Sequence, residues 1–157
     1  MKGAILEKSE NGFTFLKNIF LFIRNAQIEY NWLITACECY PENRSYAEML
    51  SKEYCWISGK QLTEMVNEEN FQWIWGVLSA FPPNISLEEV LKYQLPEADG
   101  YSGFWKNPIS IQYPLAEIEL VAWDGSLTIL ISKKDTIIEE FQRNSPLSED
   151  LEKYNKR

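Results

Sequence analysis

The sequence predicts a single α+β domain over residues 1–157, built on a mixed or mainly antiparallel sheet that helices cover on one face. Two observations lead to this prediction. A chain of 157 residues that is 45% hydrophobic suits one compact domain, which buries roughly two-thirds of its unfolded surface. Strand and helix patterns also alternate along the chain and include one hairpin, with no internal repeat and no interdomain linker.

The first part of the chain is predicted to form two strands and an amphipathic helix. A short apolar run predicts a strand over 3–8, followed by a turn at 10–12. Apolar residues at three- and four-residue spacing predict a helix over 13–24. The aromatic and β-branched run over 30–40 ends before a proline and has two apolar faces, so it predicts a strand buried on both sides.

A helix with a clear start follows in the middle of the chain. A polar loop leads through a short helix over 46–51 into a strand at 54–57. Ser58 and Gln61 then have the spacing of a capping box, which predicts a helix from this point to about Asn67.

The most aromatic strand is predicted over 71–81, and Pro82-Pro83 ends it. Strict alternation places four apolar side chains on one face of this strand: Phe71, Trp73, Trp75 and Val77. Aromatic residues on one face of a central strand are either part of the core or the floor of a ligand pocket.

The last part of the chain contains a long loop and a hairpin. A second capping box, Ser86 with Glu89, predicts a short helix to about Lys92, and residues 96–114 have no sustained period, which predicts a long ordered loop. Strands over 116–123 and 127–132 are joined by Asp124-Gly125-Ser126, and a helix over 134–142 follows. Residues 146–157 are expected to be a loosely held charged tail.

Histidine is absent from the sequence. This absence excludes Ser-His-Asp and Cys-His catalysis and His-ligated metal sites. The three cysteines, Cys37, Cys39 and Cys55, do not have the spacing of a zinc ribbon and are interpreted as buried strand residues. We therefore expect no metal, no cofactor and no enzymatic activity. An odd number of cysteines and the lack of a signal-peptide pattern favour a cytoplasmic protein.

The acidic residues are concentrated in one segment. Between residues 61 and 124 there are ten acids and two bases, so this segment contains the whole net charge of −8. Solvated helix faces would account for the count, but the segment is also rich in aromatic residues, which predicts an acidic aromatic face. Such a face disfavours nucleic acids and anionic membranes and steers a basic protein toward it.

The leading hypothesis is therefore a non-catalytic protein-binding domain of the immunity or antitoxin type, which would cover the basic active site of a toxin. Its predicted partner-binding residues are Glu97, Asp99, Tyr101, Phe104, Trp105, Glu117 and Glu119. The oligomeric state cannot be derived from the sequence.

Two alternatives belong to other functional classes. In the first, a small molecule or carbohydrate stacks in a pocket lined by Trp73, Trp75, Trp105 and Tyr101. In the second, a carboxylate pair centred on Glu117 and Glu119 hydrolyses a glycoside, since residues two apart on a strand share a face.

Three segments carry a resemblance to a known family: Met1-Lys2-Gly3-Ala4-Ile5, Tyr30-Asn31-Trp32 and the run from Phe71 to Pro82. Together they resemble a family of small cytosolic proteins of Gram-positive spore-forming bacteria, a domain of unknown function. The likeness covers about the first half of the chain. It implies a bacterial cytoplasmic setting and brings no activity, cofactor or site residue.

Overall fold

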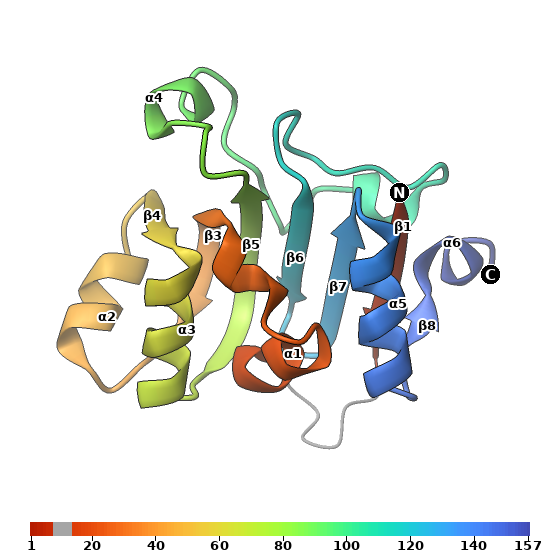
Figure 1. The fold of residues 1–157 in the computed structure, drawn as a ribbon, viewed down its shortest axis with the longest axis horizontal. Helices are drawn as coiled ribbons and strands as arrows, with labels where there is room; N and C mark the ends of the chain where they lie inside the picture. Colours follow the sequence, from red (N-terminus) through yellow and green to blue (C-terminus); the bar gives the residue numbers. More distant parts are fainter. Residues whose placement is uncertain (8–13) are drawn as a thin grey trace.

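One antiparallel sheet organises the molecule in a computed structural model that describes residues 1–7 and 14–157 (Figure 1). The eight-stranded sheet has the spatial order β4-β3-β5-β6-β7-β1-β8, and β2 pairs with β5. All described strand pairs are antiparallel, which confirms the α+β class and selects the antiparallel alternative. The strands are β1 (Lys2–Leu6), β2 (Thr14–Phe15), β3 (Asn31–Cys39), β4 (Tyr54–Ser58), β5 (Gln72–Phe81), β6 (Ile118–Trp123), β7 (Leu127–Ser132) and β8 (Glu149–Asp150).

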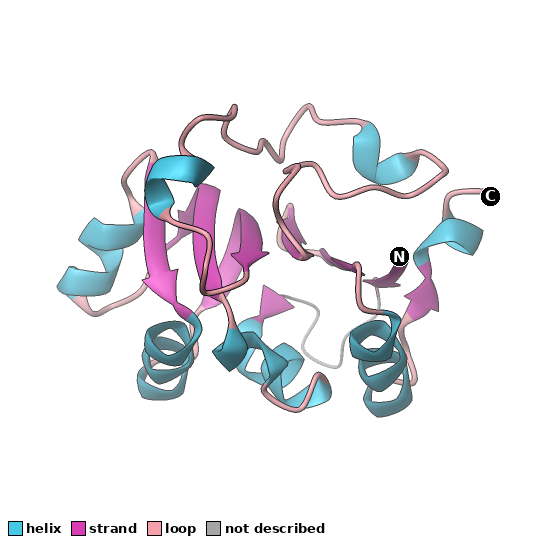
Figure 2. Cartoon of the chain, turned by 45° about the horizontal axis from the view of Figure 1, so that its top comes forward, coloured by secondary structure: helices cyan, strands magenta, loops and turns pink. Residues whose placement is uncertain are grey.

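Helices cover one face of this sheet, as expected, and we call this side the helical layer (Figures 1 and 2). Its main helices are α1 (Leu16–Phe22), α3 (Gly59–Glu68) and α5 (Asp135–Asn144), with α2 (Arg44–Leu50) beside β3 and β4. Their inward residues follow the spacing seen in the sequence and are Leu16, Ile19, Phe20, Leu62, Met65, Val66, Ile137, Ile138 and Phe141. The remaining helices are η1 (Ala26–Glu29), α4 (Leu87–Val90), η2 (Gly103–Trp105) and α6 (Leu151–Tyr154).

Both predicted capping boxes form. The Ser58 hydroxyl accepts a hydrogen bond from the Gln61 N–H at the start of α3, and Ser86 accepts one from Glu89 at the start of α4. The first helix begins later than expected, at Leu16, because Thr14 and Phe15 pair with β5 as a short strand. The predicted turn at 10–12 lies outside the described residues.

A long, mostly irregular segment covers the opposite face of the sheet, which we call the loop layer (Figure 2). Residues 91–117 contain only the 3-10 helix η2, as the long-loop prediction required. Beneath them, Val77, Val121 and Ile129 form one apolar cluster with the loop residue Phe104. Both faces of the sheet are therefore buried, one by helices and the other mainly by a loop.

The predicted alternation of β5 is wrong in its first half. The pairing of β5 with β3 shifts between Cys39↔Trp73 and Glu38↔Trp75, so two steps along β5 match one step along β3. This irregularity turns the strand over. Trp73 is fully buried in the helical-layer core, whereas Trp75 packs in the loop layer, and the two rings do not share a face.

The C-terminal residues expected to be loose are packed in the structure. Strand β8 pairs with β1, and Leu151 on α6 is fully buried. A Cβ added to Gly3 would lie 2.9 Å from a methyl group of Leu151, which shows how closely α6 approaches β1. Leu151 thus fixes the chain end to the loop-layer side of the sheet.

Candidate functional site

A buried carboxyl group holds the middle of the long loop. Glu119 lies on β6 and its Oε2 accepts a hydrogen bond from the Gln112 N–H at 2.9 Å. The Gln112 side chain then binds the backbone of Glu97 twice: its Oε1 accepts from the Glu97 N–H at 2.8 Å, and its Nε2 donates to the Glu97 carbonyl at 2.9 Å. The two sides of the loop are therefore clamped to each other and to the sheet.

Three further side chains bind loop or chain-end carbonyls. The Thr35 hydroxyl on β3 donates to the Pro96 carbonyl at 2.9 Å. Asn155 donates to the Phe104 carbonyl at 3.0 Å, and Asn107 donates to the Glu152 carbonyl at 2.9 Å. The loop and the C-terminal segment therefore hold each other in place.

The clamped loop closes an aromatic cluster with the sheet. Phe104 is buried at its centre, and around it lie Trp75, Tyr101, Trp105, Trp123 and Tyr154. Trp123 is in edge-to-face contact with Trp75 at 4.9 Å and with Trp105 at 5.2 Å between ring centroids. Tyr101 packs on Phe104 at 4.6 Å, and Trp105 lies 6.3 Å from Tyr154.

The rings around Phe104 are only partly buried, so the aromatic cluster forms part of the surface. Exposed acids neighbour these rings along the chain or across the sheet: Asp99 before Tyr101, Asp124 after Trp123, and Glu38 opposite Trp75. Lys106 follows Trp105, and Arg157 lies over the Tyr154 ring while pairing with Glu149. The cluster thus combines accessible aromatic area with mainly acidic neighbours.

Glu119 itself is fully buried, and its burial raises the pKa of the carboxyl to about 8, against the lowering effect of the Gln112 N–H. Ser79 is its direct partner across β5 and β6, so the two side chains are neighbours on one face. Among the described residues, neither Glu119 Oε1, Ser79 Oγ nor the Tyr113 hydroxyl has a hydrogen-bond partner. Burial also raises the pKa of Tyr101, and the Glu119 charge acts in the same direction. Polar groups are therefore concentrated beneath the loop.

The predicted partner-binding residues divide by exposure. Glu97 and Asp99 are exposed, and Tyr101, Trp105 and Glu117 are partly exposed. Phe104 and Glu119 are buried, so neither contributes a contact surface. Phe104 instead supports the neighbouring rings, and Glu119 supports the loop.

Glu117 and Glu119 do not face the same environment. Glu119 lies under the loop, whereas Glu117 precedes β6 and its charge acts on Tyr30 and Lys134. Tyr30 belongs to the helical-layer core. Burial raises the pKa of the Tyr30 hydroxyl, and the Glu117 carboxylate raises it further, although Lys134 opposes both. The prediction that Glu117 and Glu119 share a strand face is therefore wrong, because strand β6, with its regular alternation, begins only at Ile118.

The acids of the segment 61–124 lie in both layers rather than on one face. Glu64, Glu68 and Glu69 belong to α3 or its end in the helical layer, whereas Glu97 and Asp99 lie on the loop. Glu69 accepts the N–H groups of Glu42 and Asn43, so it has a structural partner. The charge count therefore describes the whole surface, and only some of these acids adjoin the aromatic cluster.

The alternative ligand set is divided as well. Trp75, Trp105 and Tyr101 come together in the aromatic cluster, whereas Trp73 is in the core of the other face. The sequence interpretation missed Trp123 and Tyr154. Trp123 could have been found from strand alternation, because Glu119, Val121 and Trp123 are each two residues apart on β6 and share one face. Tyr154 lies in the tail that was expected to be loose.

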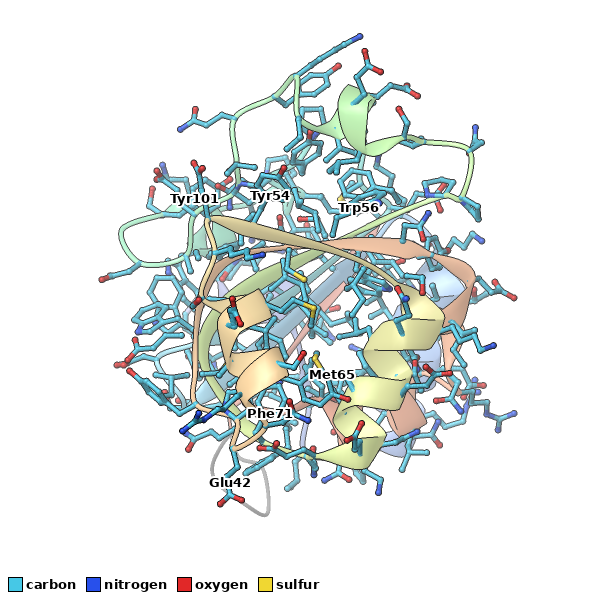
Figure 3. The ribbon with its side chains drawn as sticks, turned by 90° about the vertical axis from the view of Figure 1, so that its left-hand side faces the viewer. Glu42, Tyr54, Trp56, Met65, Phe71 and Tyr101 are labelled. Carbon is cyan, nitrogen blue, oxygen red and sulfur yellow. The ribbon has the colours of Figure 1, made fainter. Side chains whose placement is uncertain are left out.

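A separate hollow of about 420 Å³ lies at the free edge of the sheet, beside β4. It is lined by Met49, Lys52, Glu53, Tyr54, Cys55 and Trp56. Figure 3 shows Tyr54 and Trp56 on one side of β4, with Met65 and Phe71 on the side of the helices. None of the predicted site residues lines this hollow.

Two features are absent from the described part of the chain. No group of three or more His, Cys, Asp or Glu side chains is placed to hold a metal ion in residues 1–7 and 14–157. None of the helices in these ranges combines the length and the apolar composition that a membrane crossing requires.

Comparison with known proteins gives one match. Residues 1–95 match the sequence model of a family described as "Protein of unknown function (DUF2691)". The match covers more than half of the chain and ends within the loop that follows α4, before the residues that bring Tyr101, Phe104 and Trp105 to the cluster. No curated protein matches the chain, and no solved structure matches it.

Proposed function

We propose that this chain, which belongs to the DUF2691 family, is a non-catalytic protein-binding domain whose aromatic cluster contacts a basic segment of another protein. One observation carries the proposal: aromatic rings from β5, β6, the long loop and α6 converge around Phe104 and stay partly exposed. Tryptophan and tyrosine are enriched at protein interfaces and dominate their binding energy.

The loop that carries part of this surface is held before any partner arrives. Gln112, Thr35 and Asn155 each fix a loop carbonyl or N–H through hydrogen bonds of 2.8–3.0 Å. A surface ordered in advance loses little conformational entropy on binding, which favours affinity. This order supports a recognition role for the cluster.

Charge supports a basic partner. The chain has a net charge of −8, and the exposed acids Asp99, Asp124 and Glu38 neighbour the cluster. Acids near a contact surface accelerate association with a positively charged protein, most strongly at low salt. The partner that fits best is a basic enzyme. This domain would cover its active site, in the way that immunity and antitoxin proteins cover the active sites of toxins.

Charge reversal next to the cluster tests the proposal. Asp99→Lys should weaken capture of a basic partner from a lysate of the source organism and should lower the salt concentration that releases it. Glu64→Lys makes the same charge change on α3 in the helical layer. It should leave the amount of captured partner and the releasing salt concentration nearly unchanged. Quantitative mass spectrometry of salt eluates measures both effects. Equal retention of the same partner by the two variants would refute docking at the cluster.

A second candidate function rests on the rings that the ligand alternative predicted. Trp75, Trp105 and Tyr101 do lie in one cluster. Their contacts with Trp123 and Phe104 are edge-to-face, with interplanar angles of 65–89°, so the cluster is less suited to offering one flat face to a sugar. A carbohydrate-binding function predicts a saturable change in tryptophan fluorescence with a glycan, lost in Trp105→Ala.

A further inference from the structure

The three cysteines form a cluster of thiols on β3 and β4, on the opposite face of the sheet from the aromatic cluster. Cys37 and Cys39 lie on β3 and Cys55 on the neighbouring edge strand β4, and all three thiols are free. They belong to the helical-layer core or pack against it, as Tyr46 and Met49 of α2 do. The Cys37 and Cys39 sulfur atoms are 3.4 Å apart.

This proximity is not what a regular strand provides. Residues two apart on a strand are separated by about 6.6 Å along it, which keeps their side chains apart. Here β3 is irregular: Thr35 pairs with Val77 but Glu38 pairs with Trp75, so β3 contains one extra residue at this point. Ala36 takes it up with a positive φ of 51°, a conformation that non-glycine residues rarely adopt. The backbone distortion accounts for the contact between the two sulfurs.

The two thiols are chemically different. The hydrogen bond between the Cys37 and Cys39 sulfurs lowers the pKa of Cys39, although burial opposes it. The same hydrogen bond, with burial, raises the pKa of Cys37. Both side chains are partly exposed, whereas Cys55 is buried and its pKa is raised by that burial. A thiolate is the attacking species in disulfide exchange, so Cys39 is the nucleophile and Cys37 the resolving thiol.

We propose that Cys37 and Cys39 form a redox-active dithiol site whose substrates are low-molecular-weight disulfides such as glutathione disulfide. The Cys39 thiolate attacks one sulfur of glutathione disulfide, which forms a mixed disulfide and releases one glutathione thiolate. Cys37 then loses its proton, and its thiolate attacks the Cys39 sulfur and releases the second glutathione thiolate. The two glutathione thiolates take up the two cysteine protons. The protein dithiol thus loses two electrons, and glutathione disulfide gains them.

The geometry requires little movement for the second step. The two sulfurs must approach from 3.4 Å to a bond length of about 2.05 Å. The neighbouring side chain of Cys55 lies on another strand and is not needed for the reaction. This proposal is independent of partner binding at the aromatic cluster, since the residues of the two sites do not overlap.

The test uses the full chain, reduced, freed of reductant, and equilibrated with glutathione disulfide before remaining thiols are alkylated. Trypsin separates the sites, because residues 25–44 between Arg24 and Arg44 contain both Cys37 and Cys39, whereas Cys55 lies between Lys52 and Lys60. We expect the 25–44 peptide to be lighter by two hydrogen atoms and to carry no alkyl group or glutathione. Cys55 should be alkylated.

Serine variants provide the controls. In Cys37→Ser the intrachain disulfide should be lost and Cys39 should retain a glutathione adduct, whereas Cys55→Ser should form the disulfide as the wild type does. Cys39 should also react with a thiol reagent faster in the wild type than in Cys37→Ala, because alanine, unlike serine, leaves no hydrogen-bond donor beside the Cys39 sulfur. Two alkylated thiols in the 25–44 peptide, stable glutathione adducts there, or a disulfide that includes Cys55 would each overturn the proposal.

Discussion

The two faces of the same sheet are covered in different ways. On one face, α1, α3 and α5 satisfy their own backbone hydrogen bonds and contribute apolar side chains to the larger core. On the other, residues 91–117 have little regular structure, and their backbone is bound by side chains such as Gln112, Thr35 and Glu119. The helical layer is thus ordered by local sequence, and the loop layer by long-range contacts.

This difference indicates a division of roles. The helical layer contains the larger set of buried apolar side chains, which supplies most of the stability, together with a smaller set of polar groups such as the Gln27 amide, the Tyr30 hydroxyl and the Cys37–Cys39 thiol pair. The loop layer contains a buried carboxyl, unpaired hydroxyls and partly exposed aromatic rings. Groups of this kind lower stability and are retained at functional sites. We therefore expect the loop layer to open before the helical layer unfolds.

The largest effects should come from removing a buried ring in each layer. Phe141→Ala in α5 should lower the free energy of global unfolding by about 3–5 kcal/mol, since a cavity remains in the main core. Phe104→Ala removes an equally buried ring, but the loss of stability should be smaller. The loop can open without global unfolding, so the loss cannot exceed the free energy that holds the loop closed. Urea denaturation measures both. Equal losses would show that the two layers unfold as one unit.

The pH dependence of stability should come largely from the loop layer. Burial raises the pKa of Glu119 from 4.5 to about 8 in the folded chain. Between these values the folded chain keeps a proton that the unfolded chain has lost, so stability falls as the pH rises and levels off above about 8. The total fall is on the order of 5 kcal/mol.

Glu119→Gln should remove this slope while keeping an acceptor for the Gln112 N–H. Glu117→Gln is the matched control and should retain the slope. The measurement is the urea midpoint between pH 5 and 9. An unchanged slope in Glu119→Gln would mean that the carboxyl is not protonated in the folded chain.

A smaller effect is expected for the loop clamp. Gln112→Ala removes both side-chain hydrogen bonds to Glu97, at 2.8 and 2.9 Å, and should lower stability by about 1–2 kcal/mol. Most of this loss should appear as faster hydrogen exchange in residues 91–117 and little in α3 or α5. Mass spectrometry of exchanged peptides distinguishes the two regions. Uniformly faster exchange would contradict local opening.

The smallest effects compare two identical caps. Ser58→Ala removes the cap of the ten-residue helix α3 and should lower stability by about 1 kcal/mol. Ser86→Ala removes the same hydrogen bond from α4, a four-residue helix that precedes the loop, and should lower global stability by less than half as much. Thermal unfolding of both variants gives the ratio. A larger loss of stability in Ser86→Ala than in Ser58→Ala would contradict the claim that the helical layer contributes most of the stability.

Local signals in the sequence predicted most of the fold. The capping boxes at Ser58 and Ser86, the hairpin at Asp124-Gly125-Ser126 and the apolar spacing of α5 act within a few residues, so a pattern along the chain is sufficient to find them. The family resemblance on the first half of the chain also agrees with the match over residues 1–95, although the match does not extend to bacterial source or setting.

The candidate site was only partly predictable because it depends on register and topology. The face of Trp73 changes through an irregularity set by pairing with β3, which no alternation rule contains. The burial of Glu119 requires the loop to fold back over β6, and the position of Tyr154 requires β8 to pair with β1. These contacts join residues far apart in sequence. A charge count could not locate the acids in the two layers for the same reason.

Partner capture by two matched aromatic variants tests the central claim most directly. Trp105→Ala removes a partly exposed ring from the aromatic cluster, and Phe22→Ala removes a partly exposed ring from α1 in the helical layer. With both variants shown to be folded by circular dichroism, we predict that Trp105→Ala loses the basic partner from a lysate and that Phe22→Ala retains it. Retention by Trp105→Ala together with loss by Phe22→Ala would place the binding surface on the helical layer and contradict the account.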